Sequence, residues 1–185
     1  MKYLKNAVLV LFFFSAPILS KDIGVSPDGF EWHENSNVKL VIPFPNGWHL
    51  KEKNKKGIAE VFISKQKSDK NDQFDTGFSL NYIENVSETL GLTLSQYLSN
   101  FIDEIRKTKE NVSELYGRQM EQGLGGFDIR YNDEELSVIK HYFLICDFEN
   151  DTLRIMSFEA PEHEWDSAWE IGEIMLTETV LFIKS

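Results

Sequence analysis

The sequence predicts an α+β fold: a three-layer α/β/α sandwich with a central, largely antiparallel sheet of about six to seven strands. If residues 136–148 form one strand, the side chains on both of its faces are mainly apolar. This is typical of a strand inside a sheet that has a layer packed on each face. One helix follows Thr93 and another follows Pro161, so one comes early and one late. Two helices and about seven strands, mostly joined by short turns, therefore indicate helical layers on a sheet.

Length and composition indicate one globular domain. The chain has 185 residues, of which 42% are hydrophobic and 26% are charged. We expect a polar N-terminal segment at residues 21–37 and a single domain at residues 38–185. The formal net charge of −11 disfavours binding to nucleic acid and to anionic membranes.

Residues 1–20 have the pattern of a secretory signal peptide. Lys2 and Lys5 precede an apolar run, and small residues follow it before Lys21. This apolar run is shorter than the length that a membrane-spanning helix usually needs. We expect cleavage after Ser20, which would change the net charge from −11 to −13 because residues 1–20 hold two lysines and no acid. This predicts an exported protein, periplasmic or secreted.

The first half of the domain is expected to open with a hairpin. Val38–Trp48 alternates, passes Pro43 and turns at Asn46-Gly47, so we interpret it as two paired strands. A charged loop is predicted at Lys51–Gly57, followed by strands at Ile58–Ser64 and around Phe78–Tyr82.

Residues 93–96 form the clearest helix start. Thr93 and Gln96 have the spacing of a capping box. Apolar residues then recur at helical spacing and predict one buried stripe: Leu94, Tyr97, Leu98, Phe101, Ile102 and Ile105.

The second half returns to strands. A strand is predicted at Leu115–Met120, with turns at Gly123–Gly126 and Asn132–Glu135. In the strand at 136–148, Leu144 and Cys146 lie on one face. Residues 139, 143 and 145 lie on the other, together with His141. A further strand is expected at Thr152–Glu159.

Pro161 is expected to open the last helix, because proline suits the first turn. Its buried stripe would be Trp165, Ala168, Trp169, Gly172, Met175 and Leu176. Gly172 is the point at which this helix could approach a strand closely. Val180–Ile183 forms an apolar tail.

The sequence predicts no catalytic, cofactor-binding or metal-binding residue. Signature motifs for hydrolases, phosphate loops and zinc sites are absent from the sequence. We interpret His141 as a hydrogen-bonded, half-buried residue, and Cys146, the single cysteine, as a core residue. Acidic residues around the last helix start could bind a hard cation, but solvated first-turn acids are the better interpretation: Glu159, Glu162, Glu164 and Asp166, with His163 among them.

Asp69, Asn71, Asp72 and Asp75 resemble a fragment of a calcium loop. The spacing fails, because the sixth position holds no glycine and Leu80 takes the twelfth, where a glutamate is needed. A polar hairpin loop is the better interpretation.

The order of parts resembles the PsbP-like superfamily of α/β/α sandwiches. The similarity covers residues 38–182 and includes Pro45-Asn46-Gly47-Trp48, the capped helix near Thr93, and Phe158-Glu159-Ala160-Pro161 before Trp165. The superfamily includes lumenal PsbP proteins, a Ran-binding nucleotide-release factor and secreted bacterial relatives. Most members are partners or assembly factors rather than enzymes, so the resemblance implies an accessory role.

Three functions follow as hypotheses. The first is an exported, non-catalytic module that binds another envelope or secreted protein, with a basic partner suiting its negative charge. The second is a small-ligand or divalent-metal binding protein that uses a cleft between sheet and helix. The third, and weakest, is a hydrolase that uses His141 or His163 with nearby acids.

Overall fold

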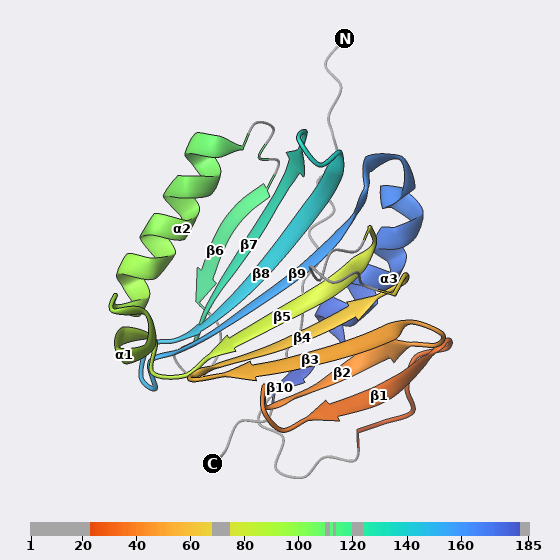
Figure 1. The fold of residues 1–185 in the computed structure, drawn as a ribbon, viewed down its shortest axis with the longest axis horizontal. Helices are drawn as coiled ribbons and strands as arrows, with labels where there is room; N and C mark the ends of the chain where they lie inside the picture. The colour runs from red at the N-terminus through yellow and green to blue at the C-terminus, as the bar shows by residue number, and fades with distance from the viewer. Residues whose placement is uncertain (1–22, 68–74, 110–111, 113, 120–123, 182–185) are drawn as a thin grey trace.

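A computed structural model describes residues 23–67, 75–109, 112, 114–119 and 124–181 (Figure 1). The expected signal peptide at 1–20 and Asp69, Asn71 and Asp72 lie outside the described residues. The elements in chain order are β1 (Phe30–Asn35), β2 (Leu40–Pro45), β3 (His49–Lys55), β4 (Ile58–Ser64), β5 (Gly77–Ile83), α1 (Val86–Leu90), α2 (Leu94–Thr108), β6 (Glu114–Gln119), β7 (Leu124–Asp133), β8 (Val138–Asp147), β9 (Thr152–Pro161), η2 (Glu162–Glu164), α3 (Trp165–Thr177) and β10 (Val180–Leu181).

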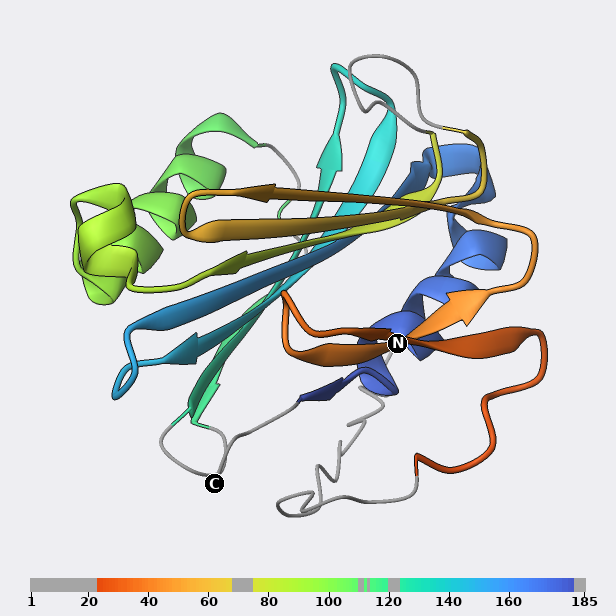
Figure 2. The ribbon, with the colours of Figure 1, turned by 60° about the horizontal axis from the view of Figure 1, so that its bottom comes forward.

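The main sheet is antiparallel throughout. In the part of the chain that the structure describes, its seven strands have the order β3-β4-β5-β9-β8-β7-β6 (Figure 1). Helix α2 lies on one face of this sheet, and α3 lies on the other together with a small sheet of β1, β2 and β10 (Figure 2). The predicted three-layer α/β/α architecture is therefore confirmed.

Strand β8 contributes side chains to both layers, as its sequence predicted. Phe143 and Ile145 belong to the core on the α3 side, and Leu144 and Cys146 belong to the core on the α2 side. Its neighbours are β9 and β7, so it is an interior strand. Burial on both faces explains why its sequence is a nearly continuous apolar run.

The predicted hairpin at Val38–Trp48 is wrong. Strand β2 pairs with β1 and β10 in the small sheet, whereas β3 pairs with β4 in the main sheet. The turn at Asn46-Gly47, with Gly47 at φ 79°, therefore carries the chain from one sheet to the other. Within the described residues, strand β10 pairs with β2 at Val41 and Leu40. Pro43 accordingly lies beyond the end of β10, where a strand tolerates a missing N–H.

Two predicted loops are parts of strands. Lys51–Lys55, expected in a charged loop, belongs to β3, and only Lys56-Gly57 forms the turn to β4. Strand β3 is an edge of the main sheet, where lysines are common because they discourage pairing with another chain. Leu124–Gly126 belongs to β7 rather than to a turn, and β7 continues to Asp133.

Both long helices carry the predicted buried stripes. In α2, the Thr93 side chain accepts a hydrogen bond from the Gln96 backbone N–H at 3.2 Å, and the Gln96 side chain accepts one from the Thr93 backbone N–H at 2.9 Å. In α3, the buried residues are Trp165, Ala168, Gly172, Met175 and Leu176. Pro161, expected to open the last helix, instead ends β9, and one turn of 3-10 helix (η2) separates it from α3.

Candidate functional site

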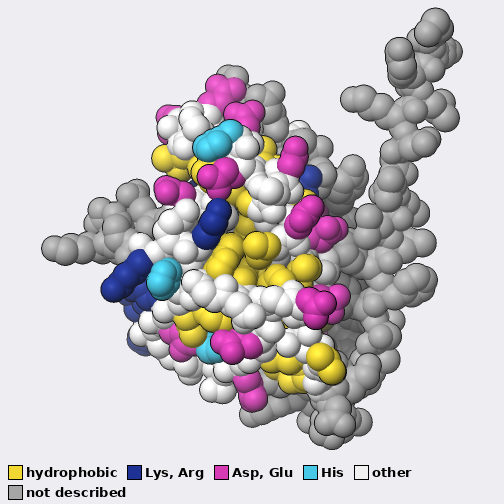
Figure 3. All heavy atoms as spheres, turned by 90° about the vertical axis from the view of Figure 1, so that its right-hand side faces the viewer, with side chains coloured by type: hydrophobic (Ala, Val, Ile, Leu, Met, Phe, Trp, Pro, Cys, Tyr) yellow, Lys and Arg dark blue, Asp and Glu magenta, His cyan; other side chains and the backbone are white. Residues whose placement is uncertain are grey.

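The strongest candidate surface lies at the end of the molecule where β2 passes into β3 and α3 begins. Figure 1 shows these segments together on its right-hand side. Figure 3 views the same side and shows apolar side chains gathered at its centre, with acidic side chains and a few basic and histidine side chains around them. We call the surface formed by the β2–β3 connection, η2 and the outer side of α3 the α3 face. Its exposed or partly buried residues are 44, 46–50, 162–164, 166, 170, 171 and 173.

An aromatic cluster supports the α3 face from below. The rings of Trp165 and Trp169 stack at 5.1 Å between centroids, and each lies 6.1 Å from the ring of Phe158 in an edge-on arrangement. A Cβ atom on Gly172 would lie 2.6 Å from the Phe158 ring. The absence of a side chain at Gly172 therefore lets α3 rest directly on β9, as the sequence predicted.

The apolar part of the face comes from the β2–β3 connection and from α3. Phe44, Trp48 and Ile171 are partly buried and pack against the core on the α3 side. Trp48 thus anchors the β2–β3 connection to that core. Leu50 is 40% exposed and pairs with Ile63, whose side chain belongs to that same core, so Leu50 lies on the same side of the sheet.

The acidic part of the face is one-sided in charge. Asp166, Glu170 and Glu173 are exposed along α3 at intervals of four and three residues, which places them on one stripe. Helix α3 contains no lysine, arginine or histidine. Like charges at this spacing destabilise a helix slightly. Asp166 in the first turn is favoured by the helix dipole, so Glu170 and Glu173 are the members of the stripe that do not help the fold. Glu162 and Glu164 in η2 extend it, and Glu164 contacts Lys65 at 3.4 Å.

The acids around the helix start do not converge as a metal site would require. Glu159 points to the opposite face of the sheet from Phe158 and pairs with Lys140 at 2.7 Å. His163 is exposed. Within the described residues, no group of three or more His, Cys, Asp or Glu side chains could hold a metal ion.

His141 lies in a hydrogen-bonded cluster, as predicted, but it is buried rather than half-buried. It is 6% exposed, its Nδ1 accepts a hydrogen bond from Arg130 Nε at 3.0 Å, and its Nε2 lies 3.4 Å from Asp128 Oδ1. The Trp169 ring lies 4.7 Å away, and the Arg130 guanidinium lies 4.6 Å from the same ring. These contacts occupy both imidazole nitrogens and join β7, β8 and α3.

Cys146 is fully buried in the core on the α2 side. Burial raises the pKa of its thiol to about 12, which is the opposite of what a nucleophile requires. The interpretation of Cys146 as a core residue is confirmed.

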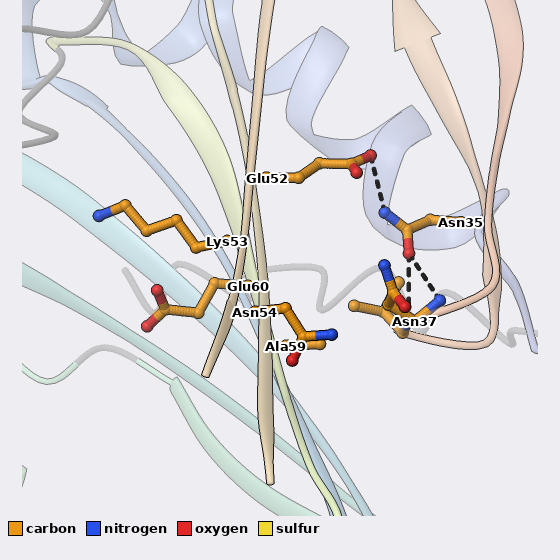
Figure 4. A pocket seen from close by; sticks show the side chains of 8 residues that line it. Asn35, Asn37, Glu52, Lys53, Asn54, Ala59 and Glu60 are labelled. Carbon is orange, nitrogen blue, oxygen red and sulfur yellow. Dashed lines mark hydrogen bonds between the residues drawn. The ribbon is translucent and has the colours of Figure 1, made fainter. Parts of the chain in front are cut away.

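A small polar pocket of about 220 Å³ lies between the β1–β2 turn and strands β3 and β4 (Figure 4). Asn35 Oδ1 accepts the backbone N–H groups of Asn37 at 3.0 Å and Val38 at 3.1 Å, and its Nδ2 donates to Glu52 at 2.8 Å. These hydrogen bonds satisfy Asn35 and fasten the β1–β2 turn to β3.

Comparison with known proteins identifies the fold. No protein-family model matches the chain, and no curated protein matches it. Among solved structures, the cyanobacterial PsbP of Synechocystis sp. PCC 6803 is 13% identical, with a TM-score of 0.50, and the match covers 87% of this chain and 96% of that one. The Ran-binding protein Mog1p of Saccharomyces cerevisiae is 11% identical, with a TM-score of 0.45 and coverage of 83% and 95%. A Pseudomonas aeruginosa protein of unknown function is 9% identical, with a TM-score of 0.38 and coverage of 78% and 93%.

The chain therefore has the PsbP-like fold that its sequence predicted. None of the helices in the described part has the length and apolarity needed to cross a bilayer.

Proposed function

We propose that this chain is an exported, non-catalytic module that binds another protein through the α3 face. The observation that carries the proposal is the apolar centre of this face with acids around it (Figure 3). An apolar centre with a polar rim is the usual anatomy of a protein interface. Glu170 and Glu173 lie beyond the first turn of α3 and repel their acidic neighbours, so a role in recognition explains them better than a role in stability. The negative charge makes a basic surface the complementary partner.

Charge and apolar contact at the face are tested separately. Leu50→Glu places a charge in the apolar part of the face. The double variant Asp166→Lys, Glu170→Lys reverses the charge of the acidic rim. Because all three positions are exposed, we expect each variant to fold normally. The wild-type chain, immobilised and exposed to envelope and secreted fractions of its host, should retain a partner that both variants lose.

Phe148→Glu is the matched control. Phe148 is 47% exposed but lies in the β8–β9 turn, at the opposite end of β9 from α3. It should retain the partner as well as wild type does. Equal retention by all variants would contradict the α3 face as the binding surface.

Export is tested by sequencing the N-terminus of the protein recovered from its host. The leader at residues 1–20 predicts a mature chain that begins at Lys21. Recovery of the full-length chain from the cytoplasm would contradict export.

The metal-binding alternative has its own test. Binding of calcium, manganese or zinc to the native state would raise the melting temperature with metal concentration. On the protein-binding proposal we expect no such rise for any of the three ions.

A further inference from the structure

Arg154 is a buried cation at the other end of β9 from the α3 face. Its side chain is on the same side of the sheet as Met156 and Phe158, and in the register it lies between Tyr82 of β5 and Ile145 of β8. Only 8% of its surface is exposed. Arginine is rarely so buried unless an acceptor pairs with its charge.

The guanidinium of Arg154 has no acceptor in the described part of the chain. Its Nε is fully buried without a hydrogen-bond partner, and none of the described side chains forms an ion pair with it. The contact that it does make is with the Tyr82 ring, whose centroid lies 4.5 Å from Cζ. A ring face attracts a cation but accepts none of the five N–H groups in the way that an oxygen does.

The two carboxylates whose charge acts on Arg154 are already engaged. Glu84 accepts from Lys39 Nζ at 2.5 Å and from the Tyr82 hydroxyl at 3.2 Å. Asp147 accepts from the backbone N–H groups of Glu149 and Asn150 and from the Asn150 side chain. Glu84 and Asp147 therefore influence Arg154 only through their field, in the direction that favours its charge.

Burial acts on Arg154 in the opposite direction. It lowers the pKa of the guanidinium, and this cost exceeds what Tyr82, Asp147 and Glu84 return. Leaving a buried charged donor without an acceptor is among the more expensive arrangements in a protein. An oxyanion that binds the guanidinium would accept charge-assisted hydrogen bonds and offset the cost of its burial.

We propose that Arg154 is the anchor of a binding site for a small oxyanion, a phosphate or carboxylate group. Its Nη nitrogens are the donors, since Nε is the nitrogen that is fully enclosed. The Tyr82 ring, whose centroid lies 4.5 Å from Cζ, forms one wall of the site, and Lys39 beside the same ring is already paired with Glu84. This site goes beyond the proposed protein-binding function and shares no residue with the α3 face.

The site is tested by titrating the purified full chain with sodium phosphate and, separately, with sodium acetate at constant ionic strength held by sodium chloride. The Nε–H signal of Arg154 in a proton–nitrogen NMR spectrum should shift saturably with one or both anions. Response to phosphate alone assigns a phosphate-class ligand, and response to acetate alone assigns a carboxylate. At ten times the dissociation constant the melting temperature should rise by about 3–5 °C.

Arg154→Met and Arg106→Met form a matched pair. Arg106 is an exposed arginine in the last turn of α2, so its replacement should leave both responses unchanged. Arg154→Met should abolish them, and in anion-free buffer it should melt no lower than wild type, because it removes an unpaired buried charge. If Arg154→Met is insoluble, the NMR titration of wild type decides alone.

Two results would overturn the site. One is the absence of any saturable shift of the Arg154 signal with either anion. The other is an equal response in Arg154→Met and wild type, which would place the anion elsewhere.

Discussion

Gly172 is the residue at which α3 comes closest to the sheet. Gly172→Ala would place a Cβ atom 2.6 Å from the Phe158 ring, so helix or ring has to move. Alanine gains about 1 kcal/mol in helix propensity, and overpacking costs about 1–3 kcal/mol. We expect a net loss of about 1 kcal/mol in the free energy of unfolding, measured by urea denaturation.

Phe158→Leu tests whether the loss comes from this contact. A smaller side chain makes room for the new methyl group, so Gly172→Ala should cost less in the Phe158→Leu background than in wild type. Equal cost in both backgrounds would show that the close approach is not responsible.

Cys146 should be chemically silent in the native state. Burial raises the pKa of its thiol from the ordinary 9.0 to about 12. The native state therefore keeps the proton that the unfolded state loses, and this contribution to stability is complete below pH 9 and lost between pH 9 and 12. A thiol-specific disulfide reagent should react with the native protein at pH 8 only as fast as the protein unfolds.

Cys146→Ala is the control for the pH dependence. It should be less stable at neutral pH because it leaves a cavity, but its unfolding free energy should fall less steeply above pH 9 than that of wild type. Parallel curves would contradict the raised pKa.

At the residue scale, sequence periodicity predicted roles that depend on which face a residue occupies. Gly172, Cys146 and His141 belong to this group, because the period of a helix or strand fixes the face. The sequence pattern also predicted that Arg154 lies in a strand. It could not predict that Arg154 lacks an acceptor, because that depends on the groups with which Glu84 and Asp147 form hydrogen bonds.

At the element scale, the capping box of α2 makes a direct prediction. Thr93→Ala removes the oxygen that accepts the Gln96 backbone N–H, so the first turn loses a hydrogen bond. We expect a loss of about 1 kcal/mol in the free energy of unfolding. Thr93→Ser keeps the acceptor and should stay close to wild type. If Thr93→Ala had the same free energy of unfolding as wild type, packing alone would determine where α2 starts.

The acidic stripe of α3 predicts a conflict between stability and binding. Glu170→Lys replaces a like-charge neighbour of Asp166 by an opposite one, four residues along the same stripe. The free energy of unfolding should rise by about 0.3–0.5 kcal/mol, while partner retention should fall. Thermal melts and retention assays on the same preparation measure both. A variant that is less stable and still binds would remove the argument for a role in recognition.

The strands were predicted better than their pairing. The bounds of β4 agree with its alternating pattern, and those of β6 differ by about one residue, because both patterns are local. Strands β2 and β3 look like a hairpin in sequence because the turn between them has hairpin residues. Which sheet each strand joins is decided instead by long-range contacts: β2 pairs with β1 and β10, and β1 lies in the segment whose sequence predicted no strand.

At the scale of the whole molecule, β9 connects two different surfaces. Its C-terminal end leads into η2 and α3 and supports the α3 face through Phe158, whereas its N-terminal half carries Arg154. The acidic composition explains the α3 face but does not explain an anion site at Arg154. Net negative charge favours basic partners, while an anion is attracted only where a local cation such as Arg154 overrides the average field.

Salt dependence should separate the two contributions to binding at the α3 face. A chain of net charge −11 attracts a basic partner over long range, so raising sodium chloride from about 0.05 to 0.5 M should slow association strongly. The Asp166→Lys, Glu170→Lys double variant should associate more slowly and with a weaker salt dependence. Leu50→Glu should instead speed dissociation and keep the wild-type salt dependence, because it disturbs the apolar centre. Surface plasmon resonance on the retained partner measures both rates, and an identical change of rates in the two variants would mean that rim and centre do not act separately.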